Sequence, residues 1–144
     1  MGEKTNLNTS LLIWFMNFNK LIPELTVIDF EKSLSFYKML GFIVEYTREN
    51  FAFLSFQGSQ LMIEKQNNTW KVGELEKPFG RGINFQISVN NIGDITSILE
   101  KNNYPIAFPL EVHTYKVKDS EFCEKEFLVQ DPDGYLLRFS QTIK

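Results

Sequence analysis

The chain has 144 residues, of which 43% are hydrophobic and 23% charged, a composition typical of one globular domain and not of a disordered segment. Its formal net charge is -3, and no basic stripe stands out, which argues against nucleic acid as a partner. The single cysteine, Cys123, excludes an internal disulfide and favours a reducing, cytoplasmic setting.

The first predicted segment is an N-terminal arm over residues 1–20. Its apolar run, residues 11–16, is shorter than the roughly 20 residues that a bilayer-spanning helix needs. The run also lacks the basic lead-in and cleavage site of a signal peptide, and the basic polar face of a membrane anchor. We therefore expect no membrane partner, and an arm that packs on the body or on a second subunit.

The first half of the body, residues 21–65, is predicted to begin with a strand over residues 22–28. Asp29 is a good N-cap for a helix that follows it. Apolar residues recur at helical spacing as far as Gly41, which is suited to a left-handed cap. Three short strands are then expected, and they cover residues 42–46, 51–56 and 60–65.

Residues 66–81 are polar and broken by glycine and proline, which indicates a linker. The same order then recurs over residues 82–141. A strand over residues 83–89 precedes a helix, which Asn90 or Asn91 caps and which Asn102 or Asn103 ends. Strands are expected near residues 106–112, 122–129 and 135–140, with a turn at 131–134 before the last. The pattern βαβββ therefore occurs twice, which predicts an α+β fold.

Side chains alternate between the two faces of a strand, so four predicted strands each combine an apolar face with a more polar one. The polar positions are Glu24, Thr26, Met62, Glu64, Asn84, Gln86, Ser88, Arg138 and Ser140. An antiparallel sheet can leave such a face in water. Alternatively, the polar faces curve toward each other and line a pocket, and alternation alone does not decide between these interpretations.

Four segments together resemble the vicinal oxygen chelate superfamily, which includes glyoxalase I, extradiol dioxygenases, fosfomycin-resistance enzymes and bleomycin-resistance proteins. They are residues 22–29 (IPELTVID), 33–42 (SLSFYKMLGF), 58–64 (GSQLMIE) and 127–139 (FLVQDPDGYLLRF). The resemblance implies one domain over residues 21–144, with modules at about 21–65 and 82–141. It also implies that curved mixed sheets form a cleft, so that the polar faces converge.

Metal-dependent members of this superfamily place His or Glu ligands on four strands. Carried over to this chain, those positions fall at Ile22, Glu64, Asn84 and Arg138. Only Glu64 is a suitable ligand, and a guanidinium opposes a metal ion. We therefore expect no metal, no cofactor and no catalytic residue, and instead an ion pair between Glu64 and Arg138 across the cleft.

The sequence is most similar to the bleomycin-resistance branch, whose members lack the metal site, sequester the drug and form clefts between the subunits of a dimer. The resemblance therefore implies a homodimer that binds and sequesters a small molecule, such as a bleomycin-type antibiotic, and the acidic net charge suits a basic ligand. An enzyme of the same superfamily with an atypical site, and a structural dimer with a vestigial pocket, are the alternatives. The expected ligand-binding residues are Glu24, Phe53, Met62, Glu64, Trp70, Asn84, Gln86, Tyr115 and Arg138.

Three of these residues, Phe53, Trp70 and Tyr115, are proposed as exposed rings on which flat parts of a ligand stack. The single histidine, His113, is expected at a strand end or in a loop with a plain surface role, since no second histidine lies nearby. Cys123 has no neighbouring base in the sequence and is expected to be a structural thiol.

Overall fold

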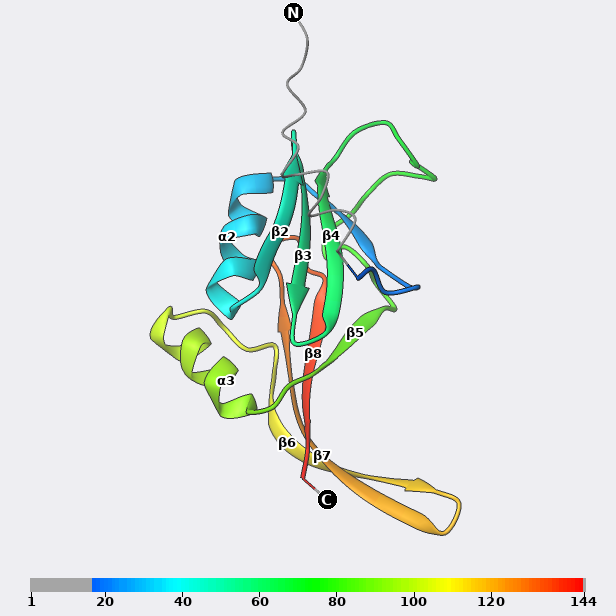
Figure 1. The fold of residues 1–144 in the computed structure, drawn as a ribbon, viewed down its shortest axis with the longest axis vertical. Coiled ribbons are helices and arrows are strands. Elements are labelled where there is room, and N and C mark those ends of the chain that lie inside the picture. Colours follow the sequence, from blue (N-terminus) through cyan, green and yellow to red (C-terminus); the bar gives the residue numbers. More distant parts are fainter. Residues whose placement is uncertain (1–16, 144) are drawn as a thin grey trace, which may run out of the picture.

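The computed structural model describes residues 17–143, so most of the arm expected over residues 1–20 lies outside the described residues. Two modules follow one another along the chain (Figure 1). The elements of the first are β1 (Glu24–Val27), α2 (Phe30–Leu40), β2 (Ile43–Arg48), β3 (Phe51–Phe56) and β4 (Ser59–Lys65). Those of the second are β5 (Asn84–Ser88), α3 (Ile92–Lys101), β6 (Phe108–Val117), β7 (Ser120–Gln130) and β8 (Leu136–Thr142).

Each module contributes one four-stranded mixed sheet, in the orders β1-β4-β3-β2 and β5-β8-β7-β6. The pairs β1–β4 and β5–β8 are parallel, because a helix connects the first strand of each module to the rest of its sheet. The remaining neighbours are antiparallel. The repeated βαβββ pattern and the α+β class predicted from the sequence are confirmed.

Both helices begin at polar caps that the sequence indicated. The Asp29 carboxylate accepts the backbone N–H of Lys32 at 3.1 Å, and Gly41 ends α2 with φ of +107°, which a residue with a side chain rarely adopts. In the second module Asn91, and not Asn90, is the N-cap, since its side chain accepts the N–H of Gly93 at 3.0 Å. Asn103 takes the left-handed conformation after α3, with φ of +53°.

The helix-covered faces of the two sheets share one hydrophobic core. Residues of β1, β3 and β4 belong to the same buried cluster as residues of β5, β7 and β8. The rings of Phe56 in β3 and Phe139 in β8 lie 6.3 Å apart and meet edge to face. Because these faces are committed to the core, the opposite, more polar faces of both sheets lie outside it.

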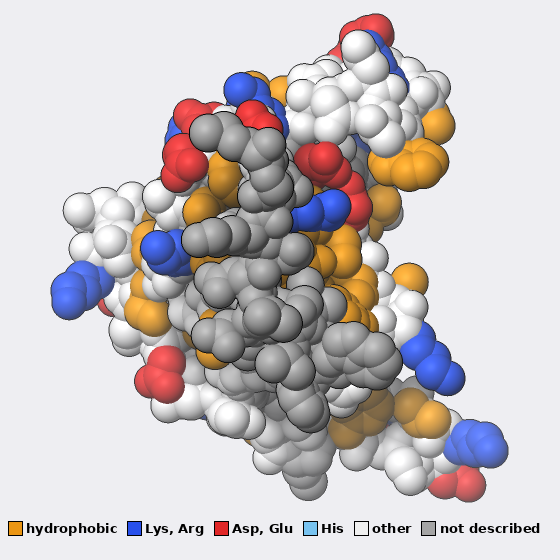
Figure 2. Space-filling view, turned by 45° about the horizontal axis from the view of Figure 1, so that its top comes forward, with side chains coloured by type: hydrophobic (Ala, Val, Ile, Leu, Met, Phe, Trp, Pro, Cys, Tyr) orange, Lys and Arg blue, Asp and Glu red, His pale blue; other side chains and the backbone are white. Residues whose placement is uncertain are grey.

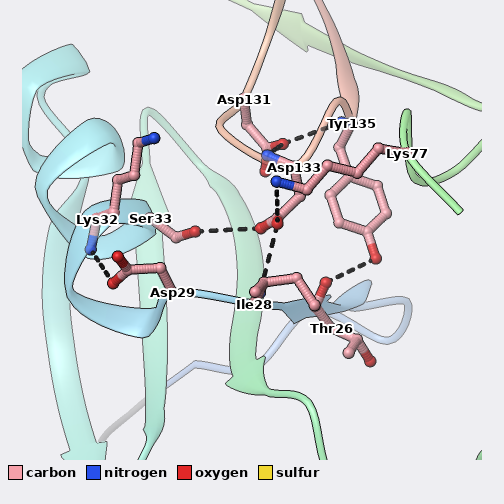
Figure 3. Close-up of polar contacts among 9 residues, drawn as sticks. All are labelled: Thr26, Ile28, Asp29, Lys32, Ser33, Lys77, Asp131, Asp133 and Tyr135. Carbon is pink, nitrogen blue, oxygen red and sulfur yellow. Dashed lines mark hydrogen bonds and ion pairs between the residues drawn. The ribbon is translucent and has the colours of Figure 1, made fainter. Parts of the chain in front are cut away.

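A buried hydrogen-bond network joins the turn before β8 to the first module (Figure 3). Tyr37 donates its hydroxyl to Asp131 at 2.7 Å, while the Ser33 hydroxyl and the Ile28 N–H each donate to Asp133 at 3.4 Å. Both aspartates are 3% exposed. We call Ser33, Tyr37, Asp131 and Asp133 the inter-module network, because they hold together segments about 100 residues apart in sequence.

Burial raises the pKa of Asp131 from 3.8 to about 6, although Tyr37 and two backbone N–H groups donate to its carboxylate. Desolvation opposes ionisation here more strongly than the three donors favour it. The folded protein therefore retains a proton on Asp131 at pH values where the unfolded chain has lost it.

The hairpin of β6 and β7 is longer than predicted. Cross-strand pairing runs from Phe108 to Val117, whereas β8 pairs with β7 only as far as Glu124, so the tip of the hairpin is a two-stranded ribbon that projects from the body (Figure 1). His113 and Tyr115 therefore lie within a strand, and the expectation that His113 sits at a strand end or in a loop is wrong.

Over residues 17–143, the helices are too short and too polar to cross a membrane.

Asp131→Asn removes the group whose ionisation is disfavoured by burial and keeps a side chain of the same shape. A pKa raised from 3.8 to about 6 corresponds to about 3 kcal/mol. As the pH rises from 4 to 7, the free energy of unfolding of the wild type should therefore fall relative to that of the variant by up to this amount. Urea unfolding at several pH values measures the difference. Parallel curves would contradict the assignment, and Asp94→Asn, on the exposed side of α3, is the control.

Gly134→Ala tests the packing of the same turn. An added Cβ would lie 2.5 Å from Cβ of Pro78, and Gly134 has φ of +99°. Gly58 is the matched control, because its φ is +84° and a Cβ there meets no atom within 4 Å. We expect Gly58→Ala to cost about 1 kcal/mol through backbone strain alone, and Gly134→Ala to cost at least about 2 kcal/mol more, as measured by thermal unfolding. Equal losses of stability in the two variants would show that the turn accommodates the added Cβ without an energetic cost.

Candidate functional site

The polar face of the second sheet carries a continuous set of hydrogen-bonding side chains. Register places Gln86 of β5 beside Arg138 of β8, and Glu126 of β7 beside Ser140. Residues paired across a ladder point to the same face, so these four side chains lie together. The sequence prediction that Gln86 and Arg138 share a face is confirmed by this register.

Arg138 belongs to a four-residue cluster on this face, with Gln86, Glu126 and Tyr115. Its guanidinium donates to the side-chain oxygen of Gln86 at 2.8 Å, and lies 3.7 Å from a carboxylate oxygen of Glu126. Tyr115 donates its hydroxyl to Glu126 at 2.9 Å, and this hydrogen bond raises the pKa of Tyr115. Glu126 is only 5% exposed, so its carboxylate is held by these two partners instead of by bulk water.

Glu124 is a second buried carboxylate, two residues along β7 on the same face. It accepts the hydroxyl of Ser140 at 2.5 Å and that of Thr142 at 2.6 Å, one on each oxygen. Hydroxyl donors stabilise the ionised form of a carboxylate. The structure therefore places two carboxylates side by side in the middle of the sheet, and each of them is hydrogen-bonded.

A cavity of about 290 Å³ opens beside this cluster, close to the size range of small-molecule sites. At the rim of the cavity, a carboxylate oxygen of Glu111 lies 3.4 Å from Nε2 of His113. Glu111 is paired across the ladder with Glu126. The other walls of the cavity are mainly apolar. The lining residues are Phe108, Pro109, Glu111, His113, Glu126, Leu128 and Leu136.

The polar face of the first sheet contains two carboxyl groups that share a hydrogen bond. Glu24 of β1 lies beside Met62 of β4, and Thr26 beside Glu64, so Glu24 and Glu64 are diagonal neighbours. The hydrogen bond to Glu64 raises the pKa of Glu24 to about 6, with smaller contributions from burial and from the charge of Glu64, while Arg48 lowers it. Glu24 therefore keeps its proton to a higher pH than an ordinary glutamate does.

Aromatic rings pack together on another part of the first-sheet face. Phe53 is 1% exposed, because Phe18 lies 5.2 Å and Tyr46 5.4 Å from its ring. The expectation that Phe53 offers an exposed stacking surface is therefore wrong. Trp70 is 85% exposed on the loop between β4 and β5, which stands out from the body beside a hollow that contains hydrophobic side chains (Figure 2).

The expected ion pair between Glu64 and Arg138 is also wrong. Arg138 pairs with Glu126 of its own sheet, and Glu64 accepts a hydrogen bond from Asn67 at 3.2 Å. The two residues point from separate sheets, whose polar faces both lie outside the shared core. Sequence reasoning missed Glu111, Glu124 and Glu126, although their alternate spacing along two strands could have indicated one acidic face.

The superfamily positions for metal ligands do not fit a metal in this chain. Ile22 offers no ligand atom, and the Arg138 guanidinium occupies another position and donates to Gln86. Within residues 17–143, no three His, Cys, Asp or Glu side chains are grouped closely enough to hold a metal ion.

Paired βαβββ modules with open mixed sheets define a class of α+β proteins. The chain belongs to the Glyoxalase/Bleomycin resistance protein/Dioxygenase superfamily, whose family model matches residues 18–139. No curated protein shows significant similarity to the sequence.

Solved structures with TM-scores above 0.5 share this fold. A glyoxalase/bleomycin resistance protein/dioxygenase from Alicyclobacillus acidocaldarius is 17% identical, with 88% of this chain and 92% of that chain covered, and a TM-score of 0.62. A bleomycin-binding protein complexed with bleomycin is 18% identical, with 86% and 98% covered and a TM-score of 0.56. A superfamily member from Vibrio splendidus 12B01 is 36% identical over 83% of this chain and 95% of that chain, with a TM-score of 0.40.

Replacement of Glu64 tests the cause of the raised Glu24 pKa on the first sheet. Glu64→Gln removes the carboxylate whose hydrogen bond and charge raise the pKa of Glu24, so that pKa should fall from about 6 toward its ordinary value of 4.5. Carbon-detected NMR of the side-chain carboxyl groups measures it directly. Glu31→Gln, on the exposed face of α2, should leave it unchanged. An unaltered Glu24 titration in Glu64→Gln would show that burial alone raises the pKa.

Proposed function

We propose that this protein binds and sequesters a small molecule on the polar face of its second sheet, without a metal and without chemical conversion. The observation that carries the proposal is the Arg138–Glu126–Tyr115 cluster beside the 290 Å³ cavity. A pocket with apolar walls and a few fixed polar groups is the usual form of a small-molecule site.

The stability of the folded protein does not by itself explain why this cluster of charged side chains is buried. Burying an ion pair is often no more stabilising than well-packed apolar residues of the same volume, because both charges lose their hydration. A sheet already covered by helices on one face has no need of ionised groups buried on the other. Their presence is explained if a ligand takes up the remaining hydrogen-bonding capacity, such as the Nε of Arg138, which has no partner among residues 17–143.

A bleomycin-type antibiotic is the first ligand to test. The support is membership of the superfamily and the shared fold with a bleomycin-binding protein complexed with bleomycin. Asn84 and Gln86 extend the same polar face toward β5, where a larger ligand would reach them.

The proposal includes a homodimer whose second copy covers this face. Several large apolar side chains on the two faces of β6 are exposed, and β6 is the edge strand of its sheet, which leaves backbone groups for a partner. They are Phe108, Leu110, Val112 and Val117. The first-sheet face of the second copy, with Glu24, Met62 and Glu64, would then form the opposite wall of the cleft. Residues 1–16, which the sequence suggested as a dimer arm, lie outside the described residues.

An enzyme with an atypical site is the second candidate, and the carboxyl pair of the first sheet favours it. A group with a pKa of about 6 is suited to proton transfer near neutral pH. In that case Glu24 and Glu64 would be the acid–base pair, and a bound compound would be recovered chemically altered.

Calorimetric titration of the chelator-treated protein with copper-loaded bleomycin tests the proposal. We expect saturable binding near one drug per subunit, and recovery of unchanged drug by mass spectrometry. Arg138→Gln should weaken binding at least about tenfold, because a hydrogen-bonding charge is lost from the site. Arg81→Gln is the matched control, since Arg81 is exposed in the linker and pairs with Glu76 at 3.8 Å.

Each contrary result has a separate meaning. An altered drug would support the enzyme, and Glu64→Gln should then abolish the conversion. Equal affinity of Arg138→Gln and the wild type would place the ligand elsewhere on the molecule. Absence of heat at all attainable concentrations would exclude bleomycin.

A further inference from the structure

The cavity face of the second sheet carries an excess of negative charge. Among the described residues, Glu111, Glu124 and Glu126 lie on this face, and Arg138 is the only permanently charged cation beside them. Lys116 and Lys125 occur on the same two strands but alternate to the opposite face. The face is therefore acidic in a protein whose overall charge is only -3.

The excess charge is partly buried and held in place. Glu124 and Glu126 are 7% and 5% exposed, and hydroxyl groups of Ser140, Thr142 and Tyr115 donate to them. Removing carboxylates from water is costly unless a cation approaches them. One guanidinium, 3.7 Å from Glu126, compensates only part of this charge.

The rest of the cavity is suited to an apolar group. Phe108, Leu128 and Leu136 line it. Register places Leu128 beside Phe108 on one side and Arg138 on the other, and Leu136 is two residues from Arg138 along β8. Glu111 and Glu126 stand directly opposite each other across the ladder at the cavity wall. A ligand with one positive charge next to an apolar group would match both the acidic part and the apolar part of the cavity.

We infer that the ligand of this face is an amphipathic organic cation, whose ammonium or guanidinium group lies between Glu111 and Glu126 and whose apolar part packs on Phe108, Leu128 and Leu136. This assignment rests on the proposed function, because it names the chemical class that the same face takes. It replaces one particular drug by a class of ligands that is defined by charge and shape.

Three probes of nearly equal size separate charge from shape: 4-phenylbutylamine, 4-phenylbutan-1-ol and 4-phenylbutanoate. They are titrated into the isotopically labelled full chain, and backbone amide shifts of Leu128 and Leu136 report binding. We expect the amine to bind at least about tenfold more tightly than the alcohol, since a charge-assisted hydrogen bond replaces a neutral one. The carboxylate should not bind, and the preference for the amine should shrink as salt is raised.

Glu111→Gln and Glu126→Gln should each reduce the preference of the amine over the alcohol toward one. Glu111 has an exposed side chain, 62% accessible, so its replacement leaves the fold intact even where that of buried Glu126 does not. Glu121→Gln is the matched control, because Glu121 lies on the opposite face of the same hairpin and pairs with Lys116 at 3.6 Å. That variant should keep the full preference.

The outcomes separate this inference from the proposed function. Alcohol or carboxylate binding as tightly as the amine would overturn the charge assignment while the face remained a small-molecule site. A preference for the amine that survives both glutamate replacements would overturn the assignment to Glu111 and Glu126. Binding of none of the three probes at Leu128 and Leu136 would overturn both the inference and the proposed use of this face.

Discussion

The inter-module network is the constraint on which the rest of the structure depends. Asp131 and Asp133 belong to a turn near the end of the chain, yet their partners Tyr37, Ser33 and the backbone of Ile28 lie in the first module. Both carboxyls are almost fully buried, and an unpaired buried carboxyl would cost several kcal/mol. The arrangement of the two modules therefore matters, because it supplies the donors Tyr37, Ser33 and Ile28 in addition to those within the turn itself.

That arrangement decides which surfaces remain for function. Once the helix-covered faces of both sheets are joined in the shared core, side chains of the opposite strand faces lie outside it. On the first sheet the rings of Phe18, Tyr46 and Phe53 pack together over part of the outer face, while Glu24 is exposed. The second sheet keeps an open cavity near the starts of β6 and β8, where Phe108, Leu128 and Leu136 line it.

The chemistry of this outer face differs from that of a metal-binding superfamily member. A guanidinium stands where a metal ligand would be needed, and it is bonded to Gln86 and Glu126. The buried carboxylates of this face, Glu124 and Glu126, are held by hydroxyl groups and by Arg138. In the proposed function, fixed charges of this kind recognise a ligand by its charge and shape. The superfamily fold alone does not decide that function.

The sequence by itself determined the order of elements, the helix caps at Asp29 and Gly41, and the polar face that holds Gln86 and Arg138. These features depend on local conformational preferences and on the twofold alternation of strands, which neighbouring residues encode. Only the tertiary structure decided that Arg138 pairs with Glu126 instead of Glu64, that Phe53 is buried, and that Asp131 has a raised pKa. Each of these depends on strand register or on the packing of distant segments. The alternation of side chains along a strand predicts on which face a side chain lies, but it does not predict which residues lie beside it on that face.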